Sequence, residues 1–213
     1  MAFELTVAAE LAGILRVGAL TCDVSRVIEH DPDLDAPLAA AEREVRAVDA
    51  LDVGPARQLY KAIGVDPTKT RPSSEALLRR VRKGDALPRI NTLVDLCNWC
   101  SLESQLPYGL YDLDRVESPV VVRRGLEGEA YAGIRKDAVH LQGRLALVDA
   151  RGPFGNPTSD SARTMVTASA RRLLVVVFAP AMASPAMVSR VLDMTSGRYR
   201  QYAGGVETWR WVS

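Results

Sequence analysis

The sequence has few of the residues that stabilise small secreted proteins or carry the commonest catalytic chemistry. Only three of its 213 residues are cysteine and two are histidine. So few cysteines exclude a disulfide-based scaffold and are typical of a protein with reduced thiols, so we expect a cytoplasmic location. No cleavable signal is apparent in the first four residues, because they lack a positively charged segment.

Long apolar runs and an excess of one charge are also missing. The longest apolar run, from Leu173 to Ala183, contains Pro180 and is too short to span a bilayer, so we expect no membrane partner. Lys and Arg number 27 against 26 Asp and Glu, for a net charge of +1. Overall charge therefore predicts neither the coating of nucleic acid nor binding to an anionic membrane, although a local basic face is compatible with it.

What remains is close to an average globular composition, with 47% hydrophobic and 25% charged residues. No internal repeat and no low-complexity linker divides the chain, so we predict one compact domain over residues 1–213 with an α+β (mixed α/β) fold. Hydrophobic periodicity predicts helices at residues 35–48, 55–63, 71–84, 88–101 and 185–193. It predicts strands at residues 3–7, 13–20, 116–123, 130–134, 145–149 and 173–178. Residues 152–161 are expected to form a loop, and the aromatic stretch 199–211 to pack on the core.

Two groups of polar residues lie on or beside the helix predicted at 88–101. Cys97 and Cys100 have C-x-x-C spacing within this helix, where a redox pair or a zinc site is disfavoured, so no metal ligand and no cofactor is predicted. Asn91, Asp95 and Asn98 are spaced i, i+4 and i+7, which places them on one helix face. Such a face serves either structural hydrogen bonding or ligand binding.

The segments on either side of these polar residues contain further candidates. Residues 107–114 are predicted to form a tight turn that carries Tyr108, Tyr111 and Asp112, residue types that line many polar pockets and also pack in plain cores. Basic residues lie before the helix and at its start, in a region with few acids, and can neutralise phosphates or simply form a solvated face. They include Arg79, Arg80, Arg82, Lys83 and Arg89.

The segment from Leu87 to Asn98, followed by Pro107 and by Tyr111-Asp112-Leu113-Asp114, resembles a known family. It is similar to the editing and tRNA-binding domain of the beta subunit of bacterial phenylalanyl-tRNA synthetase, where an N-x-x-x-D-x-x-N helix leads to a turn with two carboxylates. Asp149, Asn156 and Asp160 match later family positions loosely, and the resemblance extends over residues 7–179. Two features depart from the family: Gly109 stands where the turn has a histidine, and residues 152–160 replace a glycine-rich acidic stretch.

The resemblance implies a compact α/β domain that hydrolyses a wrongly attached amino acid from tRNA. It implies catalytic roles for Asp95, Asn98 and Asp160, which would position water or bind an amino group. Substrate contacts would come from Asn91, Tyr108, Tyr111, Asp112 and Asn156, and RNA contacts from Arg79, Arg80, Arg82, Lys83 and Arg89. The expected partners are tRNA and an amino acid or aminoacyl ester. Two alternatives stay open: a pocket for an amino acid or small metabolite that does not meet RNA, and a catalytically inert interaction domain.

Overall fold

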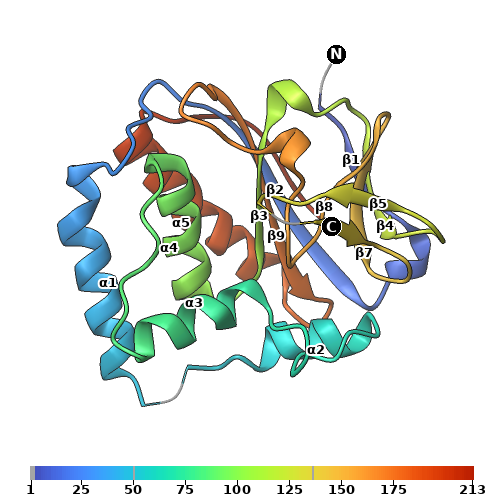
Figure 1. Cartoon of the computed structure of the whole chain (residues 1–213), viewed down its shortest axis with the longest axis horizontal. Coiled ribbons are helices and arrows are strands. Elements are labelled where there is room, and N and C mark those ends of the chain that lie inside the picture. Colours follow the sequence, from blue (N-terminus) through green and yellow to red (C-terminus); the bar gives the residue numbers. More distant parts are fainter. Residues whose placement is uncertain (1–2, 50, 136) are drawn as a thin grey trace.

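The computed structural model describes residues 3–49, 51–135 and 137–213, and it has the expected α+β fold (Figure 1). Met1 and Ala2, which belong to the stretch examined for a signal peptide, lie outside the described residues. The helices are α1 (Asp35–Ala47), α2 (Gly54–Ala62), α3 (Ser73–Arg82), α4 (Thr92–Ser104) and α5 (Pro185–Ala203). The strands are β1 (Leu5–Val7), β2 (Leu15–Asp23), β3 (Tyr108–Asp112), β4 (Val120–Arg124), β5 (Ala130–Ala132), β6 (Ala138–His140), β7 (Leu145–Asp149), β8 (Gly152–Gly155), β9 (Arg172–Pro180) and β10 (Val206–Val212).

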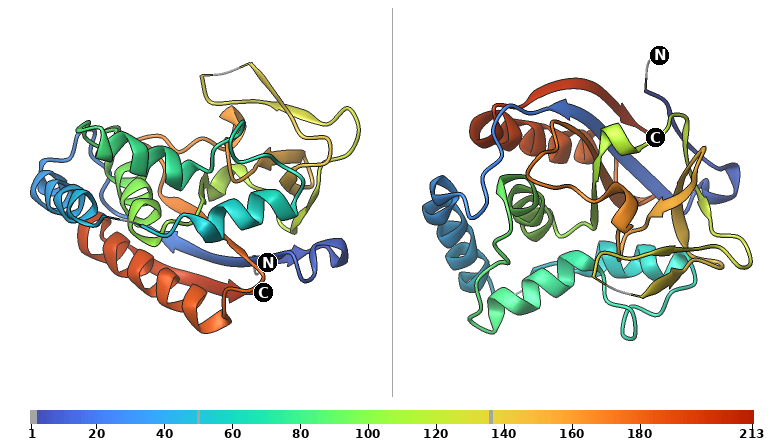
Figure 2. Two further views of the ribbon diagram at one scale, coloured as in Figure 1. Left: turned by 90° about the horizontal axis from the view of Figure 1, so that it is seen from below. Right: turned by 45° about the horizontal axis from the view of Figure 1, so that its top comes forward.

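A four-stranded antiparallel sheet in the order β10-β2-β9-β3 forms the centre of the molecule. A second sheet has the order β1-β4-β7-β8, and β5 pairs with β6 in a short hairpin. The helices α4 and α5 pack on one face of the central sheet, whereas the second sheet lies on the other side (Figures 1 and 2). None of the described helices is both long and apolar enough to cross a membrane.

The burial of both faces explains the continuous apolar run in β9. Leu173, Val175 and Val177 pack with the helices, whereas Leu174 and Val176 pack against the second sheet. Because successive side chains of a strand point to opposite faces, a strand covered on both sides needs apolar residues at every position. The prediction of a central strand at 173–178 is therefore confirmed.

Three local predictions are wrong. Residues 108–112 form an edge strand rather than a turn, because all five are buried and pair with β9 from Tyr108↔Val177 to Asp112↔Leu173. Residues 152–155 of the predicted loop form β8, which pairs with β7. The last helix continues beyond Ser196-Gly197 to Ala203, and it ends at Gly204, which has the left-handed φ of 60°. Its buried face outweighs the helix-breaking tendency of a single glycine.

Candidate functional site

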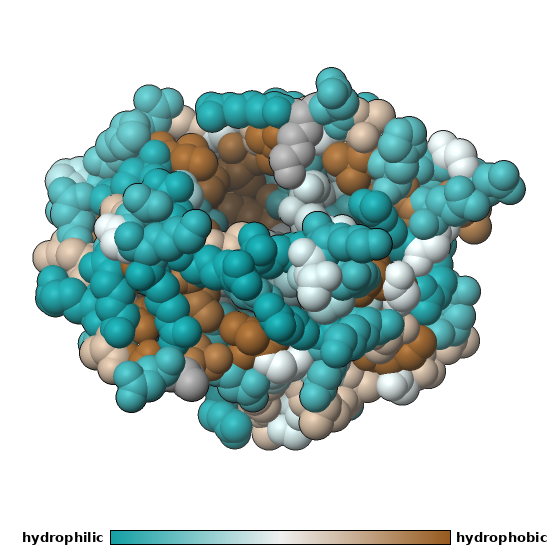
Figure 3. Space-filling model, turned by 60° about the horizontal axis from the view of Figure 1, so that its bottom comes forward, coloured by the Kyte–Doolittle hydropathy of each residue, from teal (hydrophilic) through white to brown (hydrophobic). Residues whose placement is uncertain are grey.

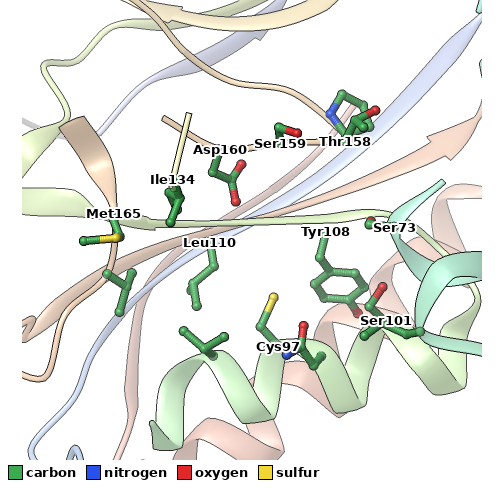
Figure 4. A pocket seen from close by; sticks show the side chains of 15 residues that line it. Ser73, Cys97, Ser101, Tyr108, Leu110, Ile134, Thr158, Ser159, Asp160 and Met165 are labelled. Carbon is green, nitrogen blue, oxygen red and sulfur yellow. The ribbon is translucent and has the colours of Figure 1, made fainter. Parts of the chain in front are cut away.

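An apolar pocket of about 210 Å³ opens between α3, α4, β3 and the loop at residues 157–166. A hollow with a hydrophobic floor is visible on the face shown in Figure 3, and Figure 4 shows the side chains of the pocket. We call it the apolar pocket. Its apolar lining consists of Leu77, Val94, Cys97, Tyr108, Leu110, Ile134, Pro157, Met165 and Val166. Its polar lining consists of Ser73, Asn98, Ser101, Thr158, Ser159 and Asp160.

Helix α4 turns one face toward this pocket. Val94, Cys97, Asn98 and Ser101 are spaced i, i+3, i+4 and i+7, the periodicity of a single helix face. In Figure 4 the thiol of Cys97 points into the pocket. Burial raises the pKa of this thiol well above its usual value, so Cys97 contributes an apolar surface rather than a thiolate.

Asp160 supplies the carboxyl group of the pocket lining, and this carboxyl points into the cavity (Figure 4). Its Oδ1 atom is buried and has no hydrogen-bond partner among the residues that the structure describes. Burial raises the pKa of Asp160 to about 7, although the nearby Tyr111 hydroxyl and the Leu110 backbone N–H act in the opposite direction. A carboxyl with this pKa is present in both protonation states near neutral pH, so it can accept or donate a proton there.

A second polar atom in the pocket also lacks a partner. Ser73 is the first residue of α3, and its Oγ is buried without a hydrogen bond to any described residue. Ser101 and Tyr108 differ, because the Ser101 hydroxyl donates to the Leu106 carbonyl at 2.8 Å and the Tyr108 hydroxyl lies 3.0 Å from Thr195 Oγ1. Buried polar groups usually have partners, so the unpartnered atoms of Ser73 and Asp160 are candidates for contact with a ligand.

The loop that carries Asp160 is fixed by its neighbours. Oδ1 of Asn156 accepts hydrogen bonds from the backbone N–H groups of Thr158 and Ser159 at 2.8 and 2.9 Å. The Tyr60 hydroxyl donates to the Pro157 carbonyl at 3.0 Å and lies 2.8 Å from Thr158 Oγ1. Asn156, predicted to contact substrate, thus shapes the loop and does not itself line the apolar pocket.

Tyr111 explains why a glycine occupies position 109, where the family resemblance implies a histidine. Its ring packs edge-on against Phe154, with ring centroids 5.0 Å apart. A Cβ atom at Gly109 or at Gly155 would lie 2.2 Å from the Tyr111 hydroxyl oxygen, closer than any real contact. The phenol of Tyr111 therefore occupies the space that a side chain at 109 would need. Its hydroxyl is buried without a hydrogen-bond partner among the described residues and lies close to Asp160.

The other predicted residues of α4 are part of a separate buried network. Asp95 is completely buried, where Oδ2 accepts from Arg89 Nε at 2.9 Å and Oδ1 from the Ile90 backbone N–H at 2.8 Å. Arg89 also pairs with Asp35 and donates to the Asp31 carbonyl. The Asn91 side chain caps α4 by accepting from the N–H groups of the next turn. Of Asn91, Asp95 and Asn98, only Asn98 lines the pocket, whereas the side chains of Asn91 and Asp95 form structural hydrogen bonds, one of the two roles open to this helix face.

Asp112 and the basic residues of α3 also lie outside the pocket lining. The Asp112 carboxylate accepts from the Asp114 N–H and from Arg115 Nε, each at 3.2 Å. Arg80 donates to the Ala86 carbonyl at 2.5 Å and Arg82 to the Val48 carbonyl at 2.9 Å. Arg79 lies 3.3 Å from Glu75, whereas exposed Lys83 has no ion pair with any residue that the structure describes. Much of this basic face is thus engaged with its own chain.

Sequence reasoning missed several residues of the site. Ser73 was visible only as the start of a helix, and Leu77, Cys97 and Leu110 only as members of apolar stripes. The pattern of residue types contains no signal that separates a pocket wall from a core contact. Over the described ranges, no group of three or more His, Cys, Asp or Glu side chains is arranged to hold a metal ion.

Comparison with known proteins gives the class of this domain. The family model for the B3/4 domain matches residues 55–210, which is most of the chain, so the chain belongs to the B3/4 domain family. The curated relatives include the phenylalanine–tRNA ligase beta subunits of two Xanthomonas campestris pv. campestris strains. Each is 32% identical over 133 residues, and the match covers 54% of this chain but only 16% of the relative.

A solved structure gives the same relationship at the level of the fold. The N-terminal fragment of the phenylalanyl-tRNA synthetase beta-subunit from Pyrococcus horikoshii superimposes with a TM-score of 0.53 at 12% identity. The superposition covers 100% of this chain and 55% of that fragment, and at this identity it shows a shared fold alone. The chain is therefore a domain related to the phenylalanyl-tRNA synthetase beta subunit, and the resemblance seen in the sequence is confirmed.

Proposed function

We propose that this chain binds the amino-acid part of an aminoacyl-tRNA in the apolar pocket and hydrolyses the ester bond. The observation that carries the proposal is the Asp160 carboxyl, which points into an apolar pocket with a buried oxygen that no described residue satisfies. Its pKa of about 7 suits a general base at neutral pH. An ester of an amino acid supplies both an apolar side chain for the walls and a reacting group for this carboxyl.

In the proposed reaction, water attacks the carbonyl carbon of the ester. The Asp160 carboxylate accepts a proton from the water as the new C–O bond forms. To the Ser73 hydroxyl, which belongs to the pocket lining and has no partner among the described residues, we assign a hydrogen bond to the carbonyl oxygen, where negative charge develops. The bond to the ribose oxygen then breaks, and that oxygen takes the proton held by Asp160 and leaves as a hydroxyl, which returns Asp160 to the carboxylate form.

Other predicted residues take different parts in this proposal. Asn98 and Tyr108 belong to the binding wall, and Tyr111 sets the surroundings of Asp160. Asp95, Arg89 and Asn91 hold the start of α4 in place rather than meeting the substrate. The basic residues Arg79, Arg80, Arg82 and Lys83 remain candidates for RNA contact.

The experiment is a hydrolysis assay with a panel of correctly and wrongly charged tRNAs. We expect release of one class of amino acid above the rate without protein, and at least a 100-fold loss in Asp160→Asn, as is typical when a general base is removed. Asp114→Asn is the matched control, because Asp114 is a carboxylate outside the pocket that is 53% exposed. No hydrolysis of any ester, or equal rates for Asp160→Asn and wild type, would contradict the proposal.

A second candidate is a pocket for a free amino acid or small metabolite without RNA. It is favoured by one observation: Arg80 and Arg82 donate to backbone carbonyls of their own chain. Thermal stabilisation by free amino acids, together with no tRNA binding at low salt, would support this alternative.

A further inference from the structure

A second hollow of about 420 Å³ lies beside the apolar pocket and has the opposite character. Three cations line it against one carboxylate: Lys69, Arg124 and Arg144 against Asp66. They come from the loop after α2, from the end of β4 and from the residue before β7. We call this second site the basic hollow.

The cations of the basic hollow are available to a ligand. Lys69 and Arg144 are exposed, and neither forms an ion pair with any described residue. The Arg124 guanidinium is held at its edge, where Nη1 donates to the carbonyls of Ile63 and Gly143 at 3.0 Å each. The Asp66 carboxylate is already used by Thr68, whose backbone N–H and hydroxyl donate to it at 2.9 and 2.7 Å. The hollow thus presents positive charge and N–H donors, the chemistry that binds phosphate.

A small gap of about 10 Å³ lies between the two sites. Pro157 and Thr158 line both this gap and the apolar pocket, whereas Thr70 and Arg144 line both the gap and the basic hollow. The apolar pocket and the basic hollow are therefore neighbours, each sharing wall residues with the small gap between them. We take an amino acid in the pocket and a phosphate in the hollow to be parts of one molecule.

We infer that the basic hollow binds a phosphate of the nucleotide that carries the esterified amino acid. This inference rests on the proposed function. It identifies the alcohol that is esterified to the amino acid as a nucleoside that carries a phosphate. The phosphate contacts come from Lys69 and Arg144 rather than from the basic residues of α3, whose guanidiniums partly bind their own chain. Phosphate groups of the RNA 3′ end and of a mononucleotide share this chemistry.

The first test measures binding of adenosine 5′-monophosphate and adenosine, which differ by the phosphate alone. We expect the wild type to bind the monophosphate about tenfold more tightly than adenosine, with a preference that weakens as salt rises. The double variant Lys69→Ala/Arg144→Ala is expected to lose this preference. Arg43→Ala/Arg190→Ala is the control, because it removes the same charge from two exposed side chains that lie outside the hollow and form no ion pair with any described residue. Equal binding of the two ligands by the wild type, or loss of the preference in the control alone, would overturn the inference.

The second test separates this inference from the proposed function. Aminoacyl esters of adenosine and of adenosine 5′-monophosphate are compared as substrates, beside a charged tRNA. We expect the phosphate to lower KM in the wild type by about tenfold and to have no effect on KM in Lys69→Ala/Arg144→Ala.

Hydrolysis with the same KM for both small esters would overturn the phosphate site but leave the proposed hydrolase activity standing. No hydrolysis of any ester would overturn the hydrolase, whereas the binding test would still decide whether the hollow takes phosphate. If Lys69→Ala/Arg144→Ala changed KM for the charged tRNA but for neither small ester, the inference would be contradicted, because the hollow would then not bind the phosphate of the terminal nucleotide.

Discussion

Two carboxylates of this protein with buried oxygen atoms, Asp95 and Asp160, have opposite surroundings. Asp95 receives hydrogen bonds from Arg89 and from the backbone of Ile90 at the start of α4. Asp160 points into the apolar pocket with an unpartnered oxygen, and burial raises its pKa to about 7. A carboxylate with a full set of partners stabilises the fold, whereas one that is left unsatisfied is available for ligands and chemistry.

The largest expected effect on stability comes from removing the carboxylate of Asp95, which has hydrogen-bond partners. Asp95→Ala leaves the Arg89 guanidinium and the Ile90 N–H without their acceptor, and we expect it to lower the free energy of unfolding by about 3 kcal/mol. Chemical denaturation checks this, with Asp114→Ala as the exposed control that should change stability by less than about 1 kcal/mol. A fall of similar size in both variants would show that Asp95 does not hold the start of α4.

Removing the unpartnered carboxyl of Asp160 should raise the free energy of unfolding instead of lowering it, and the size of this effect should depend on pH. Asp160 keeps its proton in the folded state up to pH about 7 but loses it in the unfolded state above its ordinary pKa of 3.8. Stability should therefore fall as pH rises from about 4 to 7, by on the order of 1 kcal/mol per pH unit from this group. Asp160→Asn should remove this slope, so that the variant is more stable than wild type at pH 8. Denaturation curves at pH 5, 6, 7 and 8 test this, and parallel curves for the two proteins would contradict it.

A smaller difference in the free energy of unfolding is expected between alanine variants of two adjacent serines on α3. The Ser74 hydroxyl donates to the Gln105 carbonyl at 3.1 Å, whereas Ser73 Oγ has no partner among the residues described. We expect Ser74→Ala to lower the free energy of unfolding by about 1 kcal/mol and Ser73→Ala to change it by less than about 0.5 kcal/mol. Hydrolysis should show the reverse order, with the loss in Ser73→Ala. If Ser73→Ala proves the less stable variant, or leaves hydrolysis unchanged, the assignment of this hydroxyl to the substrate is wrong.

The sequence by itself determined the helices α1 to α4, the central strand β9 and the relationship to the synthetase beta subunit. Local periodicity and a specific run of residues are enough for these, because a helix at 35–47 or an apolar strand depends on neighbours along the chain. The same information includes Asp160 and Asn98 among the candidates, and both line the pocket.

Only the tertiary structure decided which polar residues have partners. Asn91, Asp95 and Asn98 share a helical spacing, yet Arg89 and the cap of α4 engage the first two. Ser73 and Lys69 gain a position in a site because α3, the loop after α2 and the loop at residues 157–166 meet in space. The need for glycine at positions 109 and 155 is explained only by the tertiary structure, in which the Tyr111 ring lies against both. Pairing and close packing are contacts between distant segments, so no pattern of neighbouring residues contains them.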